Sequence, residues 1–193
     1  MTWANRITIG RLLLVPVFLG VLLYYAQTDR AGAPDERLRL TAFGIFLLAA
    51  ISDGVDGYLA RHCNQRTRLG AVLDPAADKL LVFTAVLSLS VIGFLTLPKF
   101  PLWFPILIIS RDVFLAVGAL TLRYFHHPVE VRPHLTGKIA TACVFAAICA
   151  ALLKLDWMPV LCWIAGFFTL VSFALYLRDG FAQFGESEHG QPL

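Results

Sequence analysis

The chain has little charge. Asp, Glu, Lys and Arg make up only 15% of its 193 residues, whereas 58% are hydrophobic. A typical soluble domain carries about 25% charged residues, so this composition excludes an ordinary soluble domain. The mean hydropathy of +0.72 instead indicates a polytopic membrane protein.

Cysteine is also scarce, and its spacing excludes two further classes. Cys143, Cys149 and Cys162 lie in apolar segments and Cys63 lies in a polar turn, with neither metal-site nor disulfide spacing. The chain lacks a nucleic-acid-binding motif, an internal repeat, a low-complexity linker and room for a soluble domain. We therefore expect no nucleic-acid partner and a single membrane domain over residues 1–193.

What the chain does contain is a series of apolar segments near the length of about 20 residues that a bilayer-spanning helix needs. They cover roughly residues 11–26, 39–60, 72–96, 101–123, 138–154 and 157–178. We predict an all-α integral membrane protein with six transmembrane helices. No small-residue cleavage site follows the first segment, so we expect it to be a retained helix rather than a signal peptide.

Lys and Arg are divided unevenly between the two sides of the predicted membrane domain. One side holds the termini and nine basic residues, and the other holds five. The first set is Arg6, Arg11, Arg61, Arg66, Arg68, Arg123, Arg132, Lys138 and Arg178, and the second is Arg30, Arg37, Arg39, Lys99 and Lys154. The positive-inside rule then predicts that both termini are cytoplasmic. Anionic lipid headgroups would attract the basic residues of that rim.

Four aspartates gather at this predicted cytosolic rim: Asp53, Asp56, Asp74 and Asp78. Carboxylates beside hydrocarbon are costly, so they require a partner, most simply a metal ion. The first two are three residues apart and the last two are four apart, so each pair shares a helix face. A polar, basic connection over 61–70 reverses the chain, which would bring both pairs to one membrane depth.

These aspartates suit a hard cation, because the set contains no histidine or cysteine. We expect Mg²⁺ or Mn²⁺, and up to eight carboxylate oxygens allow two ions. Small residues keep the neighbouring helix faces open to a bulky ligand, namely Gly54, Gly57, Ala60 and Gly70. Arg61 adds a fixed positive charge one turn beyond the first pair. Metal ions and an arginine together make a site for a pyrophosphate.

Three other interpretations of the aspartates are open. The first pair could cap a helix or pair with Arg61 while the second pair neutralises Lys79, but four acids within residues 53–78 exceed what capping needs. A divalent-cation channel or carrier would need polar residues across the membrane, whereas the rest of both segments is apolar. A non-catalytic assembly subunit would not need the full acidic set.

The aspartate region resembles the signature of the CDP-alcohol phosphatidyltransferases, Asp-x2-Asp-Gly-x2-Ala-Arg-x8-Gly-x3-Asp-x3-Asp. Every defined position matches: Asp53, Asp56, Gly57, Ala60, Arg61, Gly70, Asp74 and Asp78. Six apolar segments in a chain of this length are also similar to the common core of the family. The resemblance therefore covers essentially the whole chain.

The resemblance implies an enzyme whose donor is a CDP-linked lipid, usually CDP-diacylglycerol. A hydroxyl of a second alcohol attacks the phosphate attached to the lipid, and CMP leaves. The active site would lie at the cytoplasmic face of the cell inner membrane, or of a mitochondrial-type inner membrane. Family members often pair, so the same analogy suggests a homodimer.

The resemblance also implies residue roles. Asp53, Asp56 and Asp74 would be metal ligands, and Asp78 would touch metal and act as the general base. Asp53 would also lie at the CDP site, which would be lined by Gly57, Ala60, Arg61 and Gly70. Such transfer depends mostly on positioning and charge neutralisation. An aspartate beside two cations is a weak base, but polarisation of the acceptor hydroxyl by metal could compensate.

Basic residues further along the chain are candidates for the acceptor site. Arg111 lies within the fourth apolar segment, where an arginine is expensive unless it faces a polar cavity. It either forms an internal pair, with Asp112 or with an aspartate of another helix, or binds a phosphate of the acceptor. Lys138 opens the fifth segment on the same side, with Arg132 close by. In related enzymes, basic residues at similar places hold the acceptor's phosphate.

The N-terminal stretch over 5–16 resembles the opening helix of phosphatidylglycerophosphate synthases and of related cardiolipin synthases. Thr8 and Arg11 would approach the nucleotide or headgroup, unless Arg11 only anchors the helix at the interface. The chain length favours glycerol 3-phosphate as the acceptor. The stretch from Ser110 to Val113 is closer to cardiolipin synthases, whose acceptor is phosphatidylglycerol.

Overall fold

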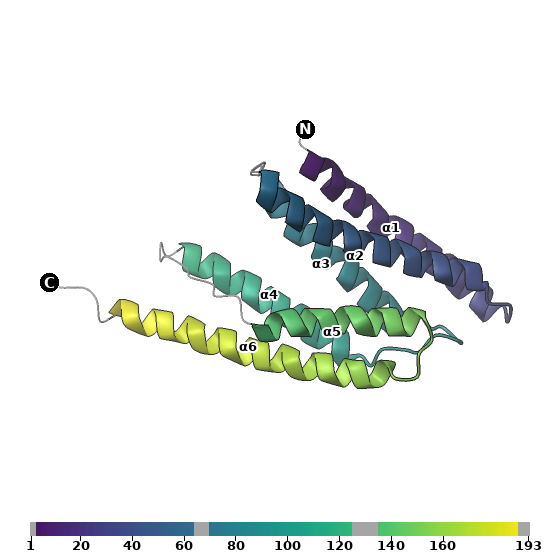
Figure 1. Cartoon of the computed structure of the whole chain (residues 1–193). Coiled ribbons are helices and arrows are strands. Elements are labelled where there is room, and N and C mark those ends of the chain that lie inside the picture. The colour runs from purple at the N-terminus through teal and green to yellow at the C-terminus, as the bar shows by residue number, and fades with distance from the viewer. Residues whose placement is uncertain (1–2, 64–69, 125–134, 189–193) are drawn as a thin grey trace. The chain divides into compact units, whose positions relative to one another are not determined.

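The computed structural model describes the backbone of residues 3–63, 70–124 and 135–188, and the side chains of residues 10–52, 79–118 and 135–179. These ranges contain six helices and no strand (Figure 1). The helices are α1 (Trp3–Arg30), α2 (Glu36–Cys63), α3 (Gly70–Val91), α4 (Trp103–Tyr124), α5 (Leu135–Leu152) and α6 (Met158–Glu188). The prediction of an all-α chain is confirmed.

Each predicted apolar segment falls on one helix, but the expected end of the third segment at residue 96 is wrong. The helix α3 stops at Val91, five residues earlier. Gly93 and Pro98 are poor helix formers. The carboxylate of Asp29 also accepts hydrogen bonds from the backbone N–H groups of Leu95 and Thr96. These N–H groups therefore have partners without continuing the helix.

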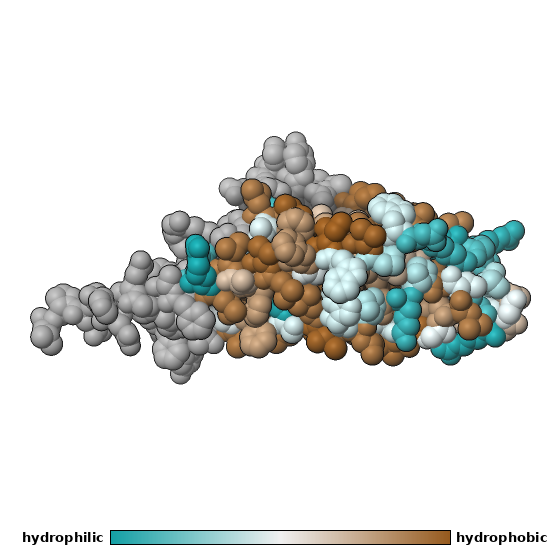
Figure 2. Space-filling view, turned by 90° about the horizontal axis from the view of Figure 1, so that it is seen from below, coloured by the Kyte–Doolittle hydropathy of each residue, from teal (hydrophilic) through white to brown (hydrophobic). Residues whose placement is uncertain are grey.

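Within the described chain, three helical stretches are long and apolar enough to cross a membrane: Gly10–Arg30, Leu135–Leu152 and Met158–Asp179. The shorter stretch Lys79–Val91 is also apolar. Hydrophobic side chains cover much of the described surface in Figure 2. On α6, Trp163, Phe167 and Leu170 are between 53% and 68% exposed and share one helix face. Such a face is compatible with an integral membrane protein.

The chain forms two compact units, of which unit 1 comprises residues 1–100 and 148–158. Here α1 packs against both α2 and α3. The contact face of α1 carries Phe18, Leu22 and Tyr25, at the i, i+4, i+7 spacing of one helix side, and all are at most 1% exposed. The ring of Phe18 lies 5.9 Å from that of Phe46 on α2. This core supports the two helices that bear the aspartate motif.

Polar contacts close the end of unit 1 that is remote from the motif. Asp29, 1% exposed, accepts a further hydrogen bond from the Thr96 hydroxyl at 2.7 Å. The hydroxyl groups of Tyr25 and Thr96 form a hydrogen bond with an oxygen–oxygen distance of 2.6 Å. Beyond α5, the ammonium of Lys154 donates to the Glu36 carboxylate at the start of α2, also at 2.6 Å. These bonds hold the loops that follow α3 and α5 to the ends of α1 and α2.

Unit 2 comprises residues 101–147 and 159–193 and contains α4, most of α5 and α6. Helices α4 and α6 are in close contact, with the Trp103 and Trp163 rings 4.9 Å apart and the Phe114 and Phe173 rings 5.7 Å apart. Gly166 makes room for this contact, because a Cβ there would lie 2.9 Å from the Trp103 ring. The packing fixes which residues of α4 face α6.

Candidate functional site

The four aspartates of the motif occupy two helix ends. Asp53 and Asp56 belong to the last turns of α2, and Asp74 and Asp78 to the first turns of α3. The connection predicted over 61–70 is confirmed in outline, since α2 ends at Cys63 and α3 begins at Gly70. On continuous helices, spacings of three and four place each pair on one face.

The side chains of residues 53–78 lie outside the described set, as do those of Thr8 and Arg132. Assembly of the aspartates with Gly57, Ala60, Arg61 and Gly70 into one site therefore stays a prediction. Among the side chains that are described, no group of three or more His, Cys, Asp or Glu residues could hold a metal ion. The aspartate set fits a hard divalent cation by its chemistry, because it offers only carboxylate oxygens.

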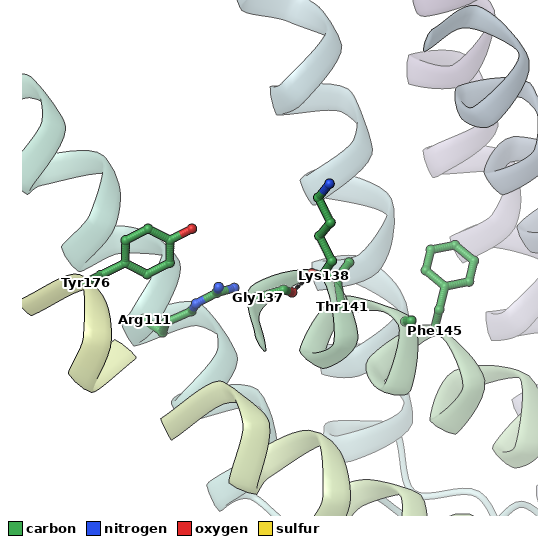
Figure 3. A pocket seen from close by; sticks show the side chains of 7 residues that line it. Arg111, Gly137, Lys138, Thr141, Phe145 and Tyr176 are labelled. Atoms are coloured by element: carbon green, nitrogen blue, oxygen red, sulfur yellow. Dashed lines mark hydrogen bonds between the residues drawn. The ribbon is translucent and has the colours of Figure 1, made fainter. Parts of the chain in front are cut away.

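A wide-open cavity of about 540 Å³ lies at the surface of unit 2 (Figure 3). Its lining comes from all three helices of that unit, with Arg111 on α4 and Tyr176 on α6. The α5 residues are Gly137, Lys138, Thr141, Ala142 and Phe145. Two of the three residues predicted for the acceptor, Arg111 and Lys138, thus share one cavity. Binding of a phosphate by these two residues stays a prediction.

Arg111 is both paired and part of the cavity wall. Its Nη1 donates to the Asp112 carboxylate at 3.3 Å, and its Nη2 donates to the Ser172 hydroxyl at 3.0 Å. The predicted contact with Asp112 is therefore confirmed. It is a single contact between neighbouring residues rather than a bidentate pair, which is the stronger geometry. The Nε atom is buried and has no hydrogen-bond partner among the described residues.

Close packing at the start of α5 shapes this part of the cavity. Figure 3 shows the Arg111 guanidinium directed toward Gly137. A Cβ at residue 137 would lie 3.1 Å from Arg111 Nη2, 3.1 Å from Ser172 Oγ and 3.7 Å from the Tyr176 hydroxyl. The Thr141 hydroxyl donates to the Gly137 carbonyl at 3.0 Å. Lys138 is exposed, which leaves its ammonium accessible to a ligand.

The contribution of α6 was missed at the sequence level. Ser172 and Tyr176 are four residues apart, so they lie on one face of that helix. The available signal was a pair of hydroxyl groups at helical spacing in a largely apolar segment. That signal is weak without knowledge that the same face meets Arg111.

The structure bears on the two interpretations of Arg11 on α1. Its side chain is only 2% exposed, so the guanidinium is buried. An arginine that only anchored its helix at the membrane interface would extend its charged group outward. The burial therefore argues against the interface-anchor interpretation. Its approach to a nucleotide or headgroup stays a prediction.

Comparison with known proteins gives the same family for most of the chain. The family model for CDP-alcohol phosphatidyltransferases matches residues 1–171. A Bacillus subtilis protein named "CDP-diacylglycerol--glycerol-3-phosphate 3-phosphatidyltransferase" is 35% identical over 179 residues, which is 87% of this chain and 89% of the relative.

Two mycobacterial relatives match shorter regions. A Mycobacterium tuberculosis protein named "Probable phosphatidylglycerophosphate synthase" is 40% identical over 119 residues, 62% of this chain and 52% of the relative. A Mycobacterium bovis protein named "Putative cardiolipin synthase" is 33% identical over 141 residues, 73% of this chain and 59% of the relative. The chain thus spans most of the Bacillus relative but little more than half of either mycobacterial one.

Proposed function

Because this chain belongs to the CDP-alcohol phosphatidyltransferase family, we propose that it transfers the phosphatidyl group of CDP-diacylglycerol to glycerol 3-phosphate and releases CMP. The observation that carries the choice of acceptor is the Bacillus relative, which matches this chain over most of its length and carries glycerol 3-phosphate in its name. The cavity of unit 2, where Arg111 and Lys138 offer two positive charges, supports an acceptor that carries a phosphate.

On the donor side, Asp53, Asp56, Asp74 and Asp78 would hold divalent ions. The family generally uses divalent metals, and for this chain we propose two ions, Mg²⁺ or Mn²⁺. When bound, the ions neutralise charge on the pyrophosphate of the donor. Around them, Thr8, Gly57, Ala60, Arg61 and Gly70 would line the CDP site, with Asp53 at its edge.

In the reaction, a hydroxyl oxygen of glycerol 3-phosphate forms a bond to the phosphorus attached to diacylglycerol. The bond from that phosphorus to the CMP oxygen breaks, and CMP leaves. Asp78 would accept the proton of the hydroxyl. Asp74, one helical turn earlier, would be a metal ligand. A well-placed general base typically contributes about 10²–10⁴-fold to such a step.

On the acceptor side, Arg111 and Lys138 would bind the phosphate of glycerol 3-phosphate, with Arg132 as a third contributor. A guanidinium suits a phosphate because its planar donors match the phosphate oxygens, and an ammonium adds a mobile point charge. The single contact with Asp112 leaves N–H groups of Arg111 for a ligand. Binding the phosphate would direct the glycerol hydroxyls away from the basic residues.

We further propose that all six helices cross the membrane, with both termini cytoplasmic. The site would then lie at the cytoplasmic face of the inner membrane, and the chain would act as a homodimer. The three long apolar helices and the exposed hydrophobic face of α6 support membrane insertion. The excess of Lys and Arg on the side of the termini supports the orientation.

A cardiolipin synthase that uses phosphatidylglycerol is the second candidate. It is favoured by the Mycobacterium bovis relative and by the sequence around Arg111. Both acceptors carry a glycerol hydroxyl near a phosphate, so one basic cavity could serve either. Membership of a transferase family argues against the divalent-cation channel or carrier.

The test is an assay of CMP release by the purified protein in detergent, with CDP-diacylglycerol, Mg²⁺ or Mn²⁺, and each acceptor in turn. We expect turnover with glycerol 3-phosphate and none after chelation of the metal. Faster turnover with phosphatidylglycerol would establish the second candidate, and no CMP with any acceptor would refute both.

Asp74→Asn and Asp78→Asn should each reduce turnover to background while the protein still folds. The matched control is Asp156→Asn, which makes the same substitution at an exposed aspartate between α5 and α6. Retained activity in either motif variant would remove that residue from the site.

A further inference from the structure

We propose that Ser172 on α6 is a positioning residue for the acceptor site, because it holds the Arg111 guanidinium at the wall of the cavity. The inference rests on the proposed function, in which Arg111 binds the acceptor's phosphate. It adds α6 to an acceptor site that the sequence assigned only to the region of α4 and α5.

The first support is the partner that Ser172 takes. Buried hydroxyl groups in helices usually donate to a carbonyl one turn earlier in the same helix. Thr169 on α6 does so, donating to the Ala165 carbonyl at 2.7 Å, and Ser90 on α3 donates to the Val86 carbonyl at 2.7 Å. Ser172 is 0% exposed and instead accepts a hydrogen bond from a charged group of another helix, at 3.0 Å.

The second support is the space around this hydrogen bond. Gly137 approaches both of its atoms, since a Cβ there would lie 3.1 Å from Arg111 Nη2 and 3.1 Å from Ser172 Oγ. A side chain at residue 137 would crowd both atoms, so the glycine leaves the space in which this hydrogen bond forms. The end of the Arg111 side chain therefore lies between its hydrogen-bond partner on α6 and the glycine of α5.

The third support is the set of donors that remains. Ser172 takes one N–H of Nη2 and Asp112 takes one N–H of Nη1. The second N–H groups of Nη1 and Nη2 are left for a ligand of the cavity that Arg111 lines, whereas Nε is buried and has no partner among the described residues. A planar guanidinium fixed at one end presents its other donors in a constant direction, as recognition of a phosphate requires.

A purely structural role for Ser172 is the rival interpretation, in which the hydroxyl only satisfies a costly buried charge. The two roles differ in what a substitution changes. Loss of a structural contact would lower the stability of the protein or raise the KM for both substrates. Loss of a positioning contact would weaken acceptor binding and leave the donor unaffected.

The experiment compares steady-state kinetics of the wild type, Ser172→Ala and Ser172→Thr with both substrates varied. Ser172→Ala should raise the KM for glycerol 3-phosphate about tenfold, the size expected for one hydrogen bond to a charged group. The KM for CDP-diacylglycerol and kcat should stay within about twofold. Ser172→Thr retains the hydroxyl and should restore most of the acceptor affinity.

Thr169→Val and Ser90→Ala are the matched controls, because each removes a buried helix hydroxyl that bonds within its own helix. Neither should change the acceptor KM. An unchanged acceptor KM in Ser172→Ala, or equal changes for both substrates, would overturn the proposal. If Ser172→Ala does not fold, Ser172→Cys keeps the side-chain size with a much weaker acceptor and should give the same selective loss.

A second readout separates this inference from the proposed function. Inorganic phosphate, used as a probe, should raise the thermal unfolding temperature of the wild type and raise that of Ser172→Ala much less. A wild type that uses no glycerol 3-phosphate but keeps this difference would refute the proposed function alone. Equal stabilisation of both proteins by phosphate would refute the role of Ser172 alone.

Discussion

At the scale of single residues, Arg111 combines two properties that the sequence presented as alternatives. An arginine within an apolar helix is costly unless its donors find partners. Here a hydroxyl and a neighbouring carboxylate each take one donor, and the side chain is still 13% exposed at the cavity. Partial pairing offsets the cost of burial and leaves donors for a ligand.

Replacement of Arg111 tests this dual role directly. We expect Arg111→Ala to raise the KM for glycerol 3-phosphate by about 10²-fold and to change the KM for CDP-diacylglycerol far less, because a charge-assisted contact to phosphate is lost. The KM of Arg111→Lys for glycerol 3-phosphate should lie between those of the wild type and Arg111→Ala, because lysine keeps the charge but lacks the planar arrangement of donors. Kinetics with both substrates varied provide the measurement, and equal effects on the two KM values would indicate a structural role.

Gly137 gives a second prediction at this scale. In a helix, replacing Gly with Ala stabilises the folded state by up to about 1 kcal/mol when there is space for the added methyl group. At Gly137 the new methyl would lie 3.1 Å from Arg111 Nη2 and from Ser172 Oγ, so one of them must shift. We expect Gly137→Ala to raise the acceptor KM severalfold and to gain none of that stability, as measured by kinetics and thermal unfolding in detergent.

Gly118 on α4 is the matched control, because a Cβ there would meet no other described residue within 4 Å. Gly118→Ala should leave the kinetics unchanged and should keep or raise the unfolding temperature. Equal effects of Gly137→Ala and Gly118→Ala on the acceptor KM and the unfolding temperature would show that the close approach at Gly137 has no consequence.

At the scale of elements, the sequence predicted helix positions well and helix ends less well. Apolar runs are a local property, so each one identified its helix. Beyond the end of α3 at Val91, the backbone N–H groups of Leu95 and Thr96 donate to Asp29, which is 66 and 67 residues away in the sequence. Nothing in the local sequence around residues 91–96 indicates that Asp29 binds this segment.

The candidate site also contains residues that the sequence predicted and a residue that it did not. The aspartate motif was readable because its residues lie at fixed spacings on two consecutive helices. Arg111 and Lys138 were readable because a cation in an apolar segment is conspicuous. Ser172 was not, since its role depends on which face of α6 meets α4, and that is set by tertiary contacts such as the one between Trp103 and Trp163.

The bonds of Asp29 lead to a stability prediction. Its carboxylate is 1% exposed and accepts from two backbone N–H groups and the Thr96 hydroxyl. Asp29→Asn removes the charge and places an N–H₂ group among donors, so the free energy of unfolding should fall by about 1.5–3 kcal/mol. Denaturant unfolding in detergent micelles would measure this change.

Asp35 supplies the control for that experiment. It accepts a hydrogen bond from the Arg37 backbone N–H at 2.9 Å as the cap of α2. Asn caps a helix about as well as Asp, so Asp35→Asn should leave the free energy of unfolding nearly unchanged. A loss of the same size in both variants would show that charge alone, rather than the buried bonds, matters.

The ion pair of Glu36 with Lys154 predicts a pH dependence at both extremes. The hydrogen bond from Lys154, and then that from Arg39, lowers the pKa of Glu36 below its ordinary value of 4.5. The hydrogen bond to Glu36 raises the pKa of Lys154 above its ordinary value of 10.5. Each shift means that the folded state favours the charged form.

The signs follow from these directions. Stabilisation from Glu36 is present above its ordinary pKa and is lost as the pH falls through the lowered value. Stabilisation from Lys154 is present below its ordinary pKa and is lost as the pH rises through the raised value. Unfolding temperatures measured against pH should therefore decline less steeply at both extremes in Glu36→Gln than in the wild type. Identical profiles for the two proteins would exclude a contribution from this exposed pair.

At the scale of the whole molecule, the proposed topology places the two ends of each membrane-crossing helix on opposite sides. The loop after α3 and the loop after α5 would then be outside the cytoplasm, and the C-terminal end of α6 would be inside. Lys99 and Asp156 are exposed residues of those loops, and Arg178 is 80% exposed near the end of α6.

Single cysteines at these three positions test the topology in a variant in which the four native cysteines are replaced. A membrane-impermeant thiol reagent added to intact cells should label Lys99→Cys and Asp156→Cys and should not label Arg178→Cys until the membrane is permeabilised. The positive-inside bias is nine basic residues against five, which predicts this direction. Labelling of Arg178→Cys alone would mean that the chain is inserted the other way, with its termini outside and the aspartate motif away from a cytoplasmic supply of CDP-lipid.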